Sequence, residues 1–181
     1  MSLLTESFLR ESASSRSLNE SIRSIEAHGG IPEEEWFDIF LSHSYLDREL
    51  IAGIYNLLTS QGLRVYVDWI VDPQLDRTNV TRESAELIRE RMFHCRSLLY
   101  AMSVAAGMSK WMPWELGCVD GHTLHKCAIL PISKVDTSTF VREEYLKLYP
   151  VVKRVDNGSS LFVTDSNNNN YGENIKNWLR K

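Results

Sequence analysis

The segment SKWMPWELG at residues 109–117 places a carboxylate beside aromatic side chains at the predicted start of a helix. Pro113 suits the first helical turn, because a residue there has no intrahelical use for an N–H group. Glu115 then lies about two residues inside the helix, where the helix dipole and free N–H groups favour its ionised form. Just before it, the indole of Trp111 offers a flat apolar wall. The segment is a candidate ligand site; alternatively, Glu115 is an ordinary helix-start acid and the tryptophans only pack.

Further polar and aromatic residues stand where two apolar runs of the sequence end. They are Ser42, His43 and Ser44 after the first run, and Asp68 and Trp69 at the end of the second. Side chains at such positions can hold a phosphate or a ribose, although polar residues after a strand are also ordinary turn formers. Asp68 and Trp69 can equally line a ligand site or anchor the loop that follows them. We interpret these residues as candidates for binding.

From Trp36 onward, short apolar runs alternate with segments of helical periodicity. The runs predict strands at residues 36–42, 63–68, 97–103 and 126–133, and a fifth at 151–155 or 161–165. The periodic segments predict helices at residues 46–60, 81–91, 112–124 and 171–180. This alternation is typical of a flavodoxin-like three-layer α/β/α fold with a parallel sheet of about five strands. Because ligands of such folds bind beyond the carboxyl ends of the strands, we expect the candidate residues to meet at one edge.

The first 30 residues differ from the rest of the chain. They are rich in serine, contain no strand-like run and end in Gly29 and Gly30, while leucine and isoleucine recur at helical spacing. We predict an N-terminal helical or partly flexible extension at residues 1–30, followed by one domain at residues 31–181. The extension can pack on that domain, serve as an oligomerisation arm or be partly disordered.

Composition and charge limit the classes of protein to consider. The chain has 181 residues, of which 43% are hydrophobic and 24% charged, as expected for one globular domain with some additional length. A net charge of -4 predicts no general attraction to nucleic acid or to anionic membranes. No apolar run reaches the length that spans a bilayer, and the N-terminus lacks the apolar block of a signal peptide. We therefore predict a cytoplasmic protein without nucleic-acid or membrane partners.

Several common kinds of site are disfavoured by the motifs. The cysteines Cys95, Cys118 and Cys127 form no CxxC pair and read as reduced thiols in a reducing compartment. His122, His125 and Cys127 resemble metal ligands, but there is no second cluster, so no metal site is predicted. Neither GxGxxG nor GxxxxGK followed by Ser or Thr occurs, which disfavours a nicotinamide-dependent dehydrogenase and a P-loop nucleotide hydrolase.

Three segments together resemble a bacterial TIR (Toll/interleukin-1 receptor) domain: FDIFLSHSYLD at 37–47, GLRVYVDW at 62–69 and SKWMPWELG at 109–117. The first resembles the opening strand and its Ser-rich loop, and the second resembles the next strand, with the family's loop beginning near Trp69. The third resembles the W-x-x-x-E arrangement of NAD-cleaving members, here Trp111 and Glu115. The likeness covers roughly residues 36–132 in order and spacing, and is weaker before and after. Among TIR proteins, the chain resembles the stand-alone bacterial kind of antiphage defence, such as the signal-generating partner in Thoeris-type systems.

The resemblance implies cleavage of the bond between nicotinamide and ribose in NAD⁺, which is the substrate and not a cofactor. Nicotinamide is positively charged while attached, so it leaves as a neutral molecule without a general acid. Positive charge develops on the ribose, and a carboxylate beside it is more valuable in the transition state than in the ground state. At about 4 Å and an effective dielectric of ~20 the attraction is roughly 4 kcal/mol, or about a thousandfold in rate. Attack by water would give ADP-ribose; attack by the substrate's own adenine or ribose would give a cyclic product.

Roles for the candidate residues follow from the same resemblance. Glu115 is the expected catalytic residue, and the expected substrate-binding residues are Ser42, His43, Ser44, Asp68, Trp69 and Trp111. A downstream effector that responds to the product, and self-association of the chain, are the further partners that the family implies. The alternative is a non-catalytic TIR scaffold, in which the loop from Trp69 to Val80 forms an interface and Glu115 is structural. A third reading is a nucleotide sensor that binds without turnover.

Overall fold

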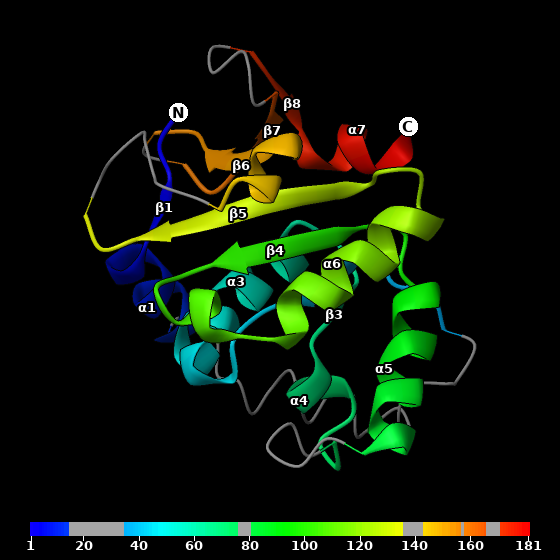
Figure 1. Cartoon of the computed structure of the whole chain (residues 1–181). Coiled ribbons are helices and arrows are strands. Elements are labelled where there is room, and N and C mark those ends of the chain that lie inside the picture. The colour runs from blue at the N-terminus through cyan, green and yellow to red at the C-terminus, as the bar shows by residue number, and fades with distance from the viewer. Residues whose placement is uncertain (15–34, 76–80, 136–142, 157, 166–170) are drawn as a thin grey trace.

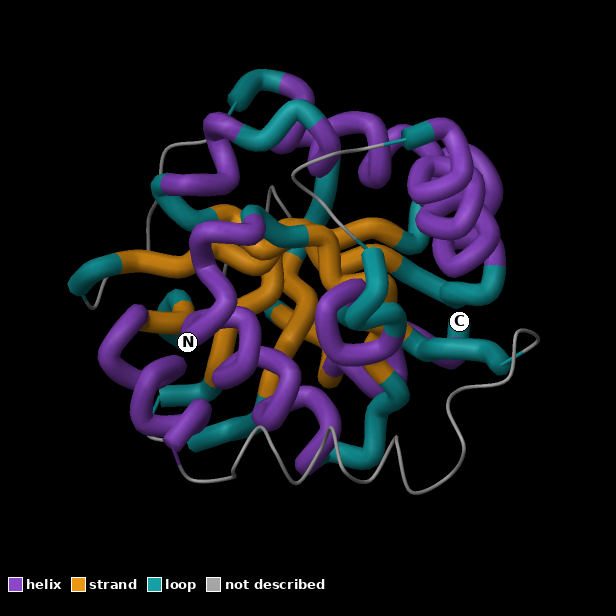
Figure 2. The backbone as a smooth tube through the Cα atoms, turned by 90° about the horizontal axis from the view of Figure 1, so that it is seen from below, coloured by secondary structure: helices purple, strands orange, loops and turns teal. Residues whose placement is uncertain are grey.

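A mostly parallel β-sheet runs through the centre of the molecule, and helices lie on both of its faces (Figures 1 and 2). The computed structural model describes residues 1–14, 35–75, 81–135, 143–156, 158–165 and 171–181. The described strands are β1 (Leu4–Thr5), β2 (Ile39–Ser42), β3 (Val65–Tyr66), β4 (Leu98–Met102), β5 (Cys127–Ser133), β6 (Val151–Arg154), β7 (Leu161–Thr164) and β8 (Gly172–Asn174). Their order across the sheet is β3-β2-β4-β5-β6-β7-β8, and β1 pairs with the end of β5.

The order of the strands places a ligand crevice at the end of β2 and β4. The strands from β3 to β6 pair in parallel, whereas β7 and β8 continue the sheet in antiparallel fashion. The chain leaves β2 towards β3 on one side and later returns to β4 on the other, so the crossovers diverge between β2 and β4. In open α/β sheets this switch point is where ligands bind. The predicted flavodoxin-like α/β/α class is confirmed.

Helices cover the two faces of the sheet in two groups. The described helices are α1 (Glu6–Ser14), α3 (Arg48–Ser60), α4 (Asp68–Val71), α5 (Arg82–Phe93), α6 (Trp111–His122) and α7 (Ile175–Arg180), with 3₁₀ turns η1 (Tyr45–Asp47), η2 (Ala105–Met108) and η3 (Tyr145–Leu148). Side chains alternate between faces along each strand, so Ile39 and Leu41 pack with α1, α3 and α7. Phe40, between them in the chain, packs on the opposite face with α5, α6 and η3.

Local sequence signals explain where two of the helices begin and end. Helix α5 starts with a capping box, in which the Thr81 hydroxyl accepts from the backbone N–H of Ser84 and the Ser84 side chain bonds the backbone of Thr81. Helix α3 ends shortly before Gly62, whose φ of 78° lies in the left-handed region that glycine adopts without strain. Both helices agree with the predicted segments.

Three segments differ from the sequence predictions. The helix predicted from residue 46 begins at Arg48, because residues 45–47 form the turn η1. Asp68, predicted to end a strand, starts the short helix α4. The first residues of the helix predicted at 171–180 form β8, and both candidates for the fifth strand, β6 and β7, are strands. The pairing of β8 with β7 depends on distant residues, which local periodicity does not contain, whereas the Ser44 side chain caps η1 locally.

The N-terminal residues that the structure describes are built into the core. Leu4 in β1 pairs with Ile132 of β5, and Leu3, Leu4 and Leu9 are fully buried. Helix α1 lies so close to α3 that a Cβ at Gly53 would stand 2.1 Å from the backbone oxygen of Leu9. The boundary predicted near residue 30 lies in residues 15–34, outside the described residues. Within the described parts of the chain, no helix is both long and apolar enough to cross a bilayer.

Candidate active site

A hydrogen bond between Ser42 and Glu115 lies at the centre of the candidate site. Ser42 is the last residue of β2, and its hydroxyl donates to Oε2 of Glu115 over 2.6 Å. Both residues are fully buried. A bond of this length from a hydroxyl to a carboxylate is in the charge-assisted range, which holds the carboxylate in one orientation. The contact joins the strand at the switch point to helix α6.

Helix α6 places Glu115 one turn after Trp111, on the same side of the helix. The helix begins with the backbone N–H of Met112 donating to the Ser109 hydroxyl over 3.3 Å. Trp111 is half-buried, and its ring meets that of Trp114 edge to face, with centroids 5.4 Å apart. The indole predicted to form a wall before Glu115 thus packs against a second tryptophan at the start of the helix.

His43, Asp68 and Trp69 meet across the ends of β2 and β3. Nδ1 of His43 lies 2.8 Å from the backbone oxygen of Leu41, and the indole N–H of Trp69 donates to Nε2 over 3.2 Å. Since an indole N–H can only donate, Nε2 is the accepting nitrogen and Nδ1 is placed to donate to the Leu41 oxygen. One carboxylate oxygen of Asp68 lies 3.4 Å from Nε2 and also accepts the backbone N–H of Trp69 over 2.7 Å. This arrangement uses His43 to hold the indole and does not leave it as a free general base.

Arg48 joins this group, although no sequence motif pointed to it. Its guanidinium lies 4.6 Å from the centroid of the Trp69 ring and 5.2 Å from that of Tyr45. The side chain is exposed at the start of α3, so the two rings hold a cation at the edge where β2 ends. A stack of this kind leaves N–H donors of the guanidinium directed towards solvent or an anion.

A cavity of about 300 Å³ lies between the loop after β2 and the start of α6. Three of the predicted residues line it: His43, Ser44 and Trp111. Ser42 and Glu115 do not line it. Ser42 directly precedes the lining residue His43, and Glu115 lies one helical turn after the lining residue Trp111. The carboxylate therefore lies behind the cavity wall and is closed off from solvent in this state.

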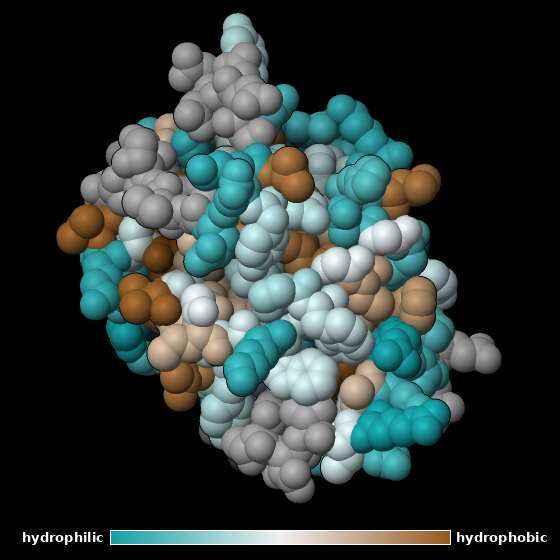
Figure 3. Space-filling model, viewed as in Figure 1, coloured by the Kyte–Doolittle hydropathy of each residue, from teal (hydrophilic) through white to brown (hydrophobic). Residues whose placement is uncertain are grey.

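Apolar side chains surround the mouth of this cavity. Tyr45, Leu46 and Met108 line it and are 48%, 71% and 71% exposed. Several hydrophobic residues reach the surface at the left edge of the molecule in Figure 3, the end towards which β4 and β5 point in Figure 1. Elsewhere on the face shown, hydrophobic residues are more scattered among hydrophilic ones (Figure 3).

Comparison with known proteins decides the family. No family model matches the chain. Over 139 residues it is 45% identical to a protein of Bacillus cereus (strain MSX-D12) named "Probable 3' cyclic ADP-D-ribose synthase ThsB'", covering 75% of this chain and 72% of that protein. The chain belongs to the Thoeris-type bacterial TIR-domain family. A second, more distant match is 24% identical over 87 residues, 48% of this chain and 23% of the other protein, which is the "Putative cyclic ADP-D-ribose synthase TIR2" of Cytobacillus dafuensis.

The segment that follows Trp69 in this TIR domain is anchored by a buried ion pair. Asp72 accepts two hydrogen bonds from the Arg91 guanidinium, of 2.9 and 3.0 Å, and one of 2.9 Å from the Tyr66 hydroxyl. Burial, and then the charge of Asp72, raise the pKa of Tyr66 well above its ordinary value. The cluster ties the end of α4 to α5, so the first part of the predicted loop is fixed to the domain core.

The cysteines of the TIR domain have the properties of structural thiols. All three are free; Cys95 and Cys127 are buried and Cys118 is half-buried. Burial raises the pKa of each thiol, to about 12 for Cys127. Since the thiolate is the reactive form, none of them is prepared for nucleophilic chemistry at neutral pH. Among the described residues, no three His, Cys, Asp or Glu side chains gather as metal ligands.

Proposed function

We propose that this TIR domain cleaves the nicotinamide–ribose bond of NAD⁺ and closes the remaining ADP-ribosyl group into a cyclic ADP-ribose, as part of antiphage defence. The observation that carries the proposal is the Ser42–Glu115 contact at the switch point of the sheet, one helical turn from Trp111. The names of both relatives, each a cyclic ADP-D-ribose synthase, support the cyclic over the linear product.

The chemistry requires one well-placed carboxylate. When the bond from the ribose carbon to the nicotinamide nitrogen breaks, its electron pair goes to the ring, which leaves as neutral nicotinamide. The ribose becomes an oxocarbenium-like cation, and Glu115 stabilises it electrostatically. A hydroxyl of the adenosine ribose then attacks that carbon and loses its proton, so NAD⁺ gives nicotinamide, a cyclic product and one proton. Ser42 positions the carboxylate and is not itself a reacting group.

The remaining residues at the rim suit the other parts of the substrate. Trp111 and His43 line the cavity with flat rings, and Trp69 holds His43 through its indole N–H. Lys110 lines the cavity and Arg48 stacks on Tyr45 at its edge, so two cations are placed to bind the diphosphate. His43 and Ser44, at the end of β2, are placed for the ribose hydroxyls. These roles divide the site into an apolar end beside the carboxylate and a cationic end towards solvent.

The buried state of Glu115 has a consequence for how the enzyme works. Because the carboxylate is 0% exposed, it reaches a ribose only after the wall between it and the cavity moves. The closed state is consistent with an enzyme that stays inactive until assembly or a trigger opens the site. The exposed Tyr45, Leu46 and Met108 around the mouth favour assembly through this end of the molecule. The same residues are the observation that supports the second candidate function, a non-catalytic interaction module.

Product analysis after incubation with NAD⁺ tests the proposal. The wild-type chain and Glu115→Gln would be incubated alone and with extract of phage-infected cells, and the products separated by chromatography and identified by mass spectrometry. We expect nicotinamide and a cyclic ADP-ribose from the wild type and neither from the variant. Equal turnover by both proteins would remove Glu115 from the mechanism. Binding of NAD⁺ without any product would favour a sensor, and self-association without binding would favour a scaffold.

A further inference from the structure

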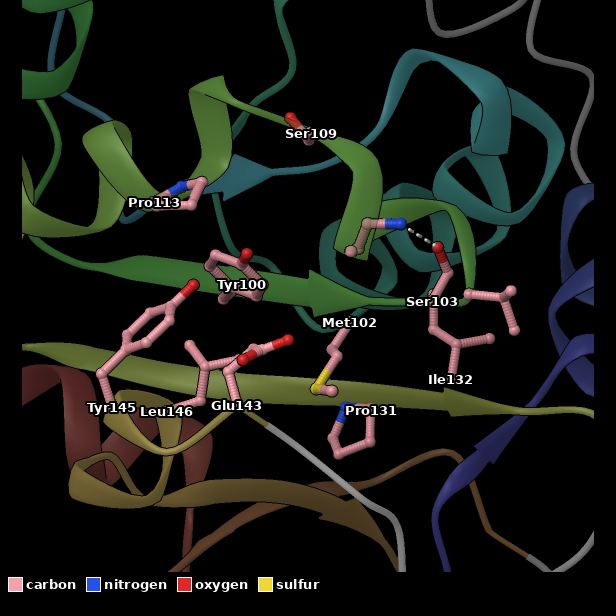
Figure 4. Close-up of a pocket in the computed structure, with 13 residues that line it drawn as sticks. Tyr100, Met102, Ser103, Ser109, Pro113, Pro131, Ile132, Glu143, Tyr145 and Leu146 are labelled. Atoms are coloured by element: carbon pink, nitrogen blue, oxygen red, sulfur yellow. Dashed lines mark hydrogen bonds between the residues drawn. The ribbon is translucent and has the colours of Figure 1, made fainter.

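A second cavity, of about 410 Å³, lies on the other side of the η2 turn. Figure 4 shows its walls: Tyr100 and Met102 from β4, Pro131 and Ile132 from β5, and Glu143 and Tyr145 at the start of η3. None of the residues assigned to NAD⁺ above lines this cavity, and Ser109 lines both cavities. Its size is within the range of sites that hold small organic molecules.

The lining of the second cavity selects a particular kind of ligand. Most of the described wall is apolar, and among the described residues that line it Glu143 alone has a charged side chain. In Figure 4 the side chains of Glu143 and Tyr145 are directed inwards from η3, opposite Ser103 and Ile132. The phenol of Tyr100 is buried and hydrogen-bonds with Tyr145, which together raise its pKa and keep it protonated. The site therefore offers a carboxylate acceptor and hydroxyl groups to a planar ligand, and repels an anion.

The η2 turn couples this cavity to the NAD⁺ site. Ala106 and Gly107 of the turn line the second cavity, whereas Ala105 and Met108 line the first. Ser103, in the second cavity, accepts the backbone N–H of Ala106 over 3.0 Å and donates to Asp47, at the end of η1. A ligand in the second cavity therefore presses on a single turn that forms one wall of each cavity.

We propose that the second cavity binds nicotinamide, through which the released product slows further turnover. The identity of the ligand rests on the proposed function, because that reaction releases nicotinamide beside the cavity. Nicotinamide is planar and uncharged; its amide N–H groups can donate to Glu143 and its carbonyl can accept from a hydroxyl. Nicotinate has the same shape but carries a carboxylate, which Glu143 repels; the lining residues within the described part of the chain include no cation to offset that repulsion. A bound ring supports η2 from behind and favours the state in which Glu115 is covered.

The methionines provide a direct test, because Met102 lines the second cavity and Met108 the first. The intact chain would be labelled with ¹³C at its methionine methyl groups and titrated with nicotinamide and, separately, with nicotinate. We expect saturable shifts of the Met102 methyl signal with nicotinamide and at least about fivefold weaker binding of nicotinate. In Glu143→Gln the two affinities should come within about twofold of each other. Glu144→Gln, an exposed neighbour outside the cavity, is the control and should keep the wild-type ratio.

A kinetic measurement connects binding to regulation. At saturating NAD⁺, added nicotinamide should still lower the rate of the wild-type enzyme, with half-inhibition near the affinity reported by Met102. Glu143→Gln should shift both values by the same factor. Shifts confined to Met108, equal affinity for nicotinamide and nicotinate, or inhibition unchanged in Glu143→Gln would each overturn the inference. The titration needs no turnover, so a wild type that stays inactive even with extract of phage-infected cells would contradict the proposed function while Met102 still reports on the site.

Discussion

Two buried carboxylates of this TIR domain have contrasting partners. Asp72 lies among the Arg91 guanidinium and the Tyr66 hydroxyl, on the side of the sheet covered by α5. Glu115 is equally buried, but the bond that orients it comes from the Ser42 hydroxyl at the switch point of the sheet. The carboxylate of Asp72 is neutralised by the positive charge of Arg91. The carboxylate of Glu115 is held in place by a hydroxyl beside a cavity that suits a ligand.

The difference separates a structural acid from a catalytic one better than burial does. A bidentate arginine satisfies a carboxylate in the folded state and stabilises it in one position. A hydroxyl orients a carboxylate without neutralising its charge, so the charge remains available to a cation that forms during a reaction. Asp72 should then matter for stability and Glu115 for rate, and each of the following experiments can contradict that division.

Glu115→Gln should have the largest effect. The amide keeps the shape of the side chain and can still accept from Ser42, but it removes the negative charge that stabilises the ribose cation. We expect nicotinamide release to fall at least about a thousandfold, roughly 4 kcal/mol of transition-state stabilisation. Thermal unfolding should change little, because an isosteric neutral group carries no desolvation penalty. A fall in stability large enough to explain the lost activity would place Glu115 with the structural acids.

Asp72→Ala should show the opposite pattern. The substitution leaves the Arg91 charge buried without its bidentate partner, and breaking buried pairs in this way costs about 3 kcal/mol or more of unfolding free energy. For a domain of this size the melting temperature should fall by roughly 6–12 °C. Glu86→Ala, which breaks the exposed pair with Arg82, is the control and should change the free energy by less than about 0.5 kcal/mol. If the folded fraction of Asp72→Ala lost activity as fully as Glu115→Gln, the division between the two acids would fail.

The order of strands and helices could be read from the sequence because it depends on local patterns. The apolar run before Ser42 and the capping residue Thr81 are signals of that kind. Contacts between distant segments have no such signal. Strand β8 forms because Glu173 pairs with Val163, and β1 because Leu4 pairs with Ile132. Short strands of this kind have too little periodicity to identify and exist through their partners.

The candidate site divides in the same way. Two features of the sequence predicted which residue supplies the carboxylate: the spacing of Trp111 and Glu115, and the family resemblance. The predicted fold then indicated at which edge of the sheet this carboxylate lies. The bond from Ser42 spans 73 positions and depends on how α6 seats against β2. The hydrogen bond that His43 accepts depends on the direction of the Trp69 indole, and the place of Arg48 depends on its stacking on the rings of Tyr45 and Trp69. Side-chain partnerships of this type follow from packing and not from spacing.

Gly53→Ala tests the packing of α1 on α3, at a site separate from Asp72 and Glu115. A Cβ at this position meets the backbone of Leu9, which cannot move without shifting α1, so overpacking should cost about 2 kcal/mol of unfolding free energy. Gly121→Ala is the control: it lies in α6 with open space around its Cβ, and should stabilise the chain by roughly 0.5 kcal/mol. Denaturation by urea measures both. Equal behaviour of the two variants would mean that α1 does not dock on α3 in solution.

Ser42→Ala should have the smallest effect and tests the comparison most finely. The charge of Glu115 remains, but one of the contacts that orient it is lost, so we expect kcat to fall about tenfold with little change in KM, equal to ~1.4 kcal/mol. Ser97 is an equally buried serine, just before β4, whose hydroxyl donates to the backbone oxygen of Asp38 over 2.7 Å and not to Glu115. Ser97→Ala should lower stability by about 1 kcal/mol and leave kcat unchanged. The two alanine variants could instead lose the same stability and keep the wild-type kcat. The Ser42 hydroxyl would then be an ordinary hydrogen-bonded group of the core, and another contact would orient Glu115.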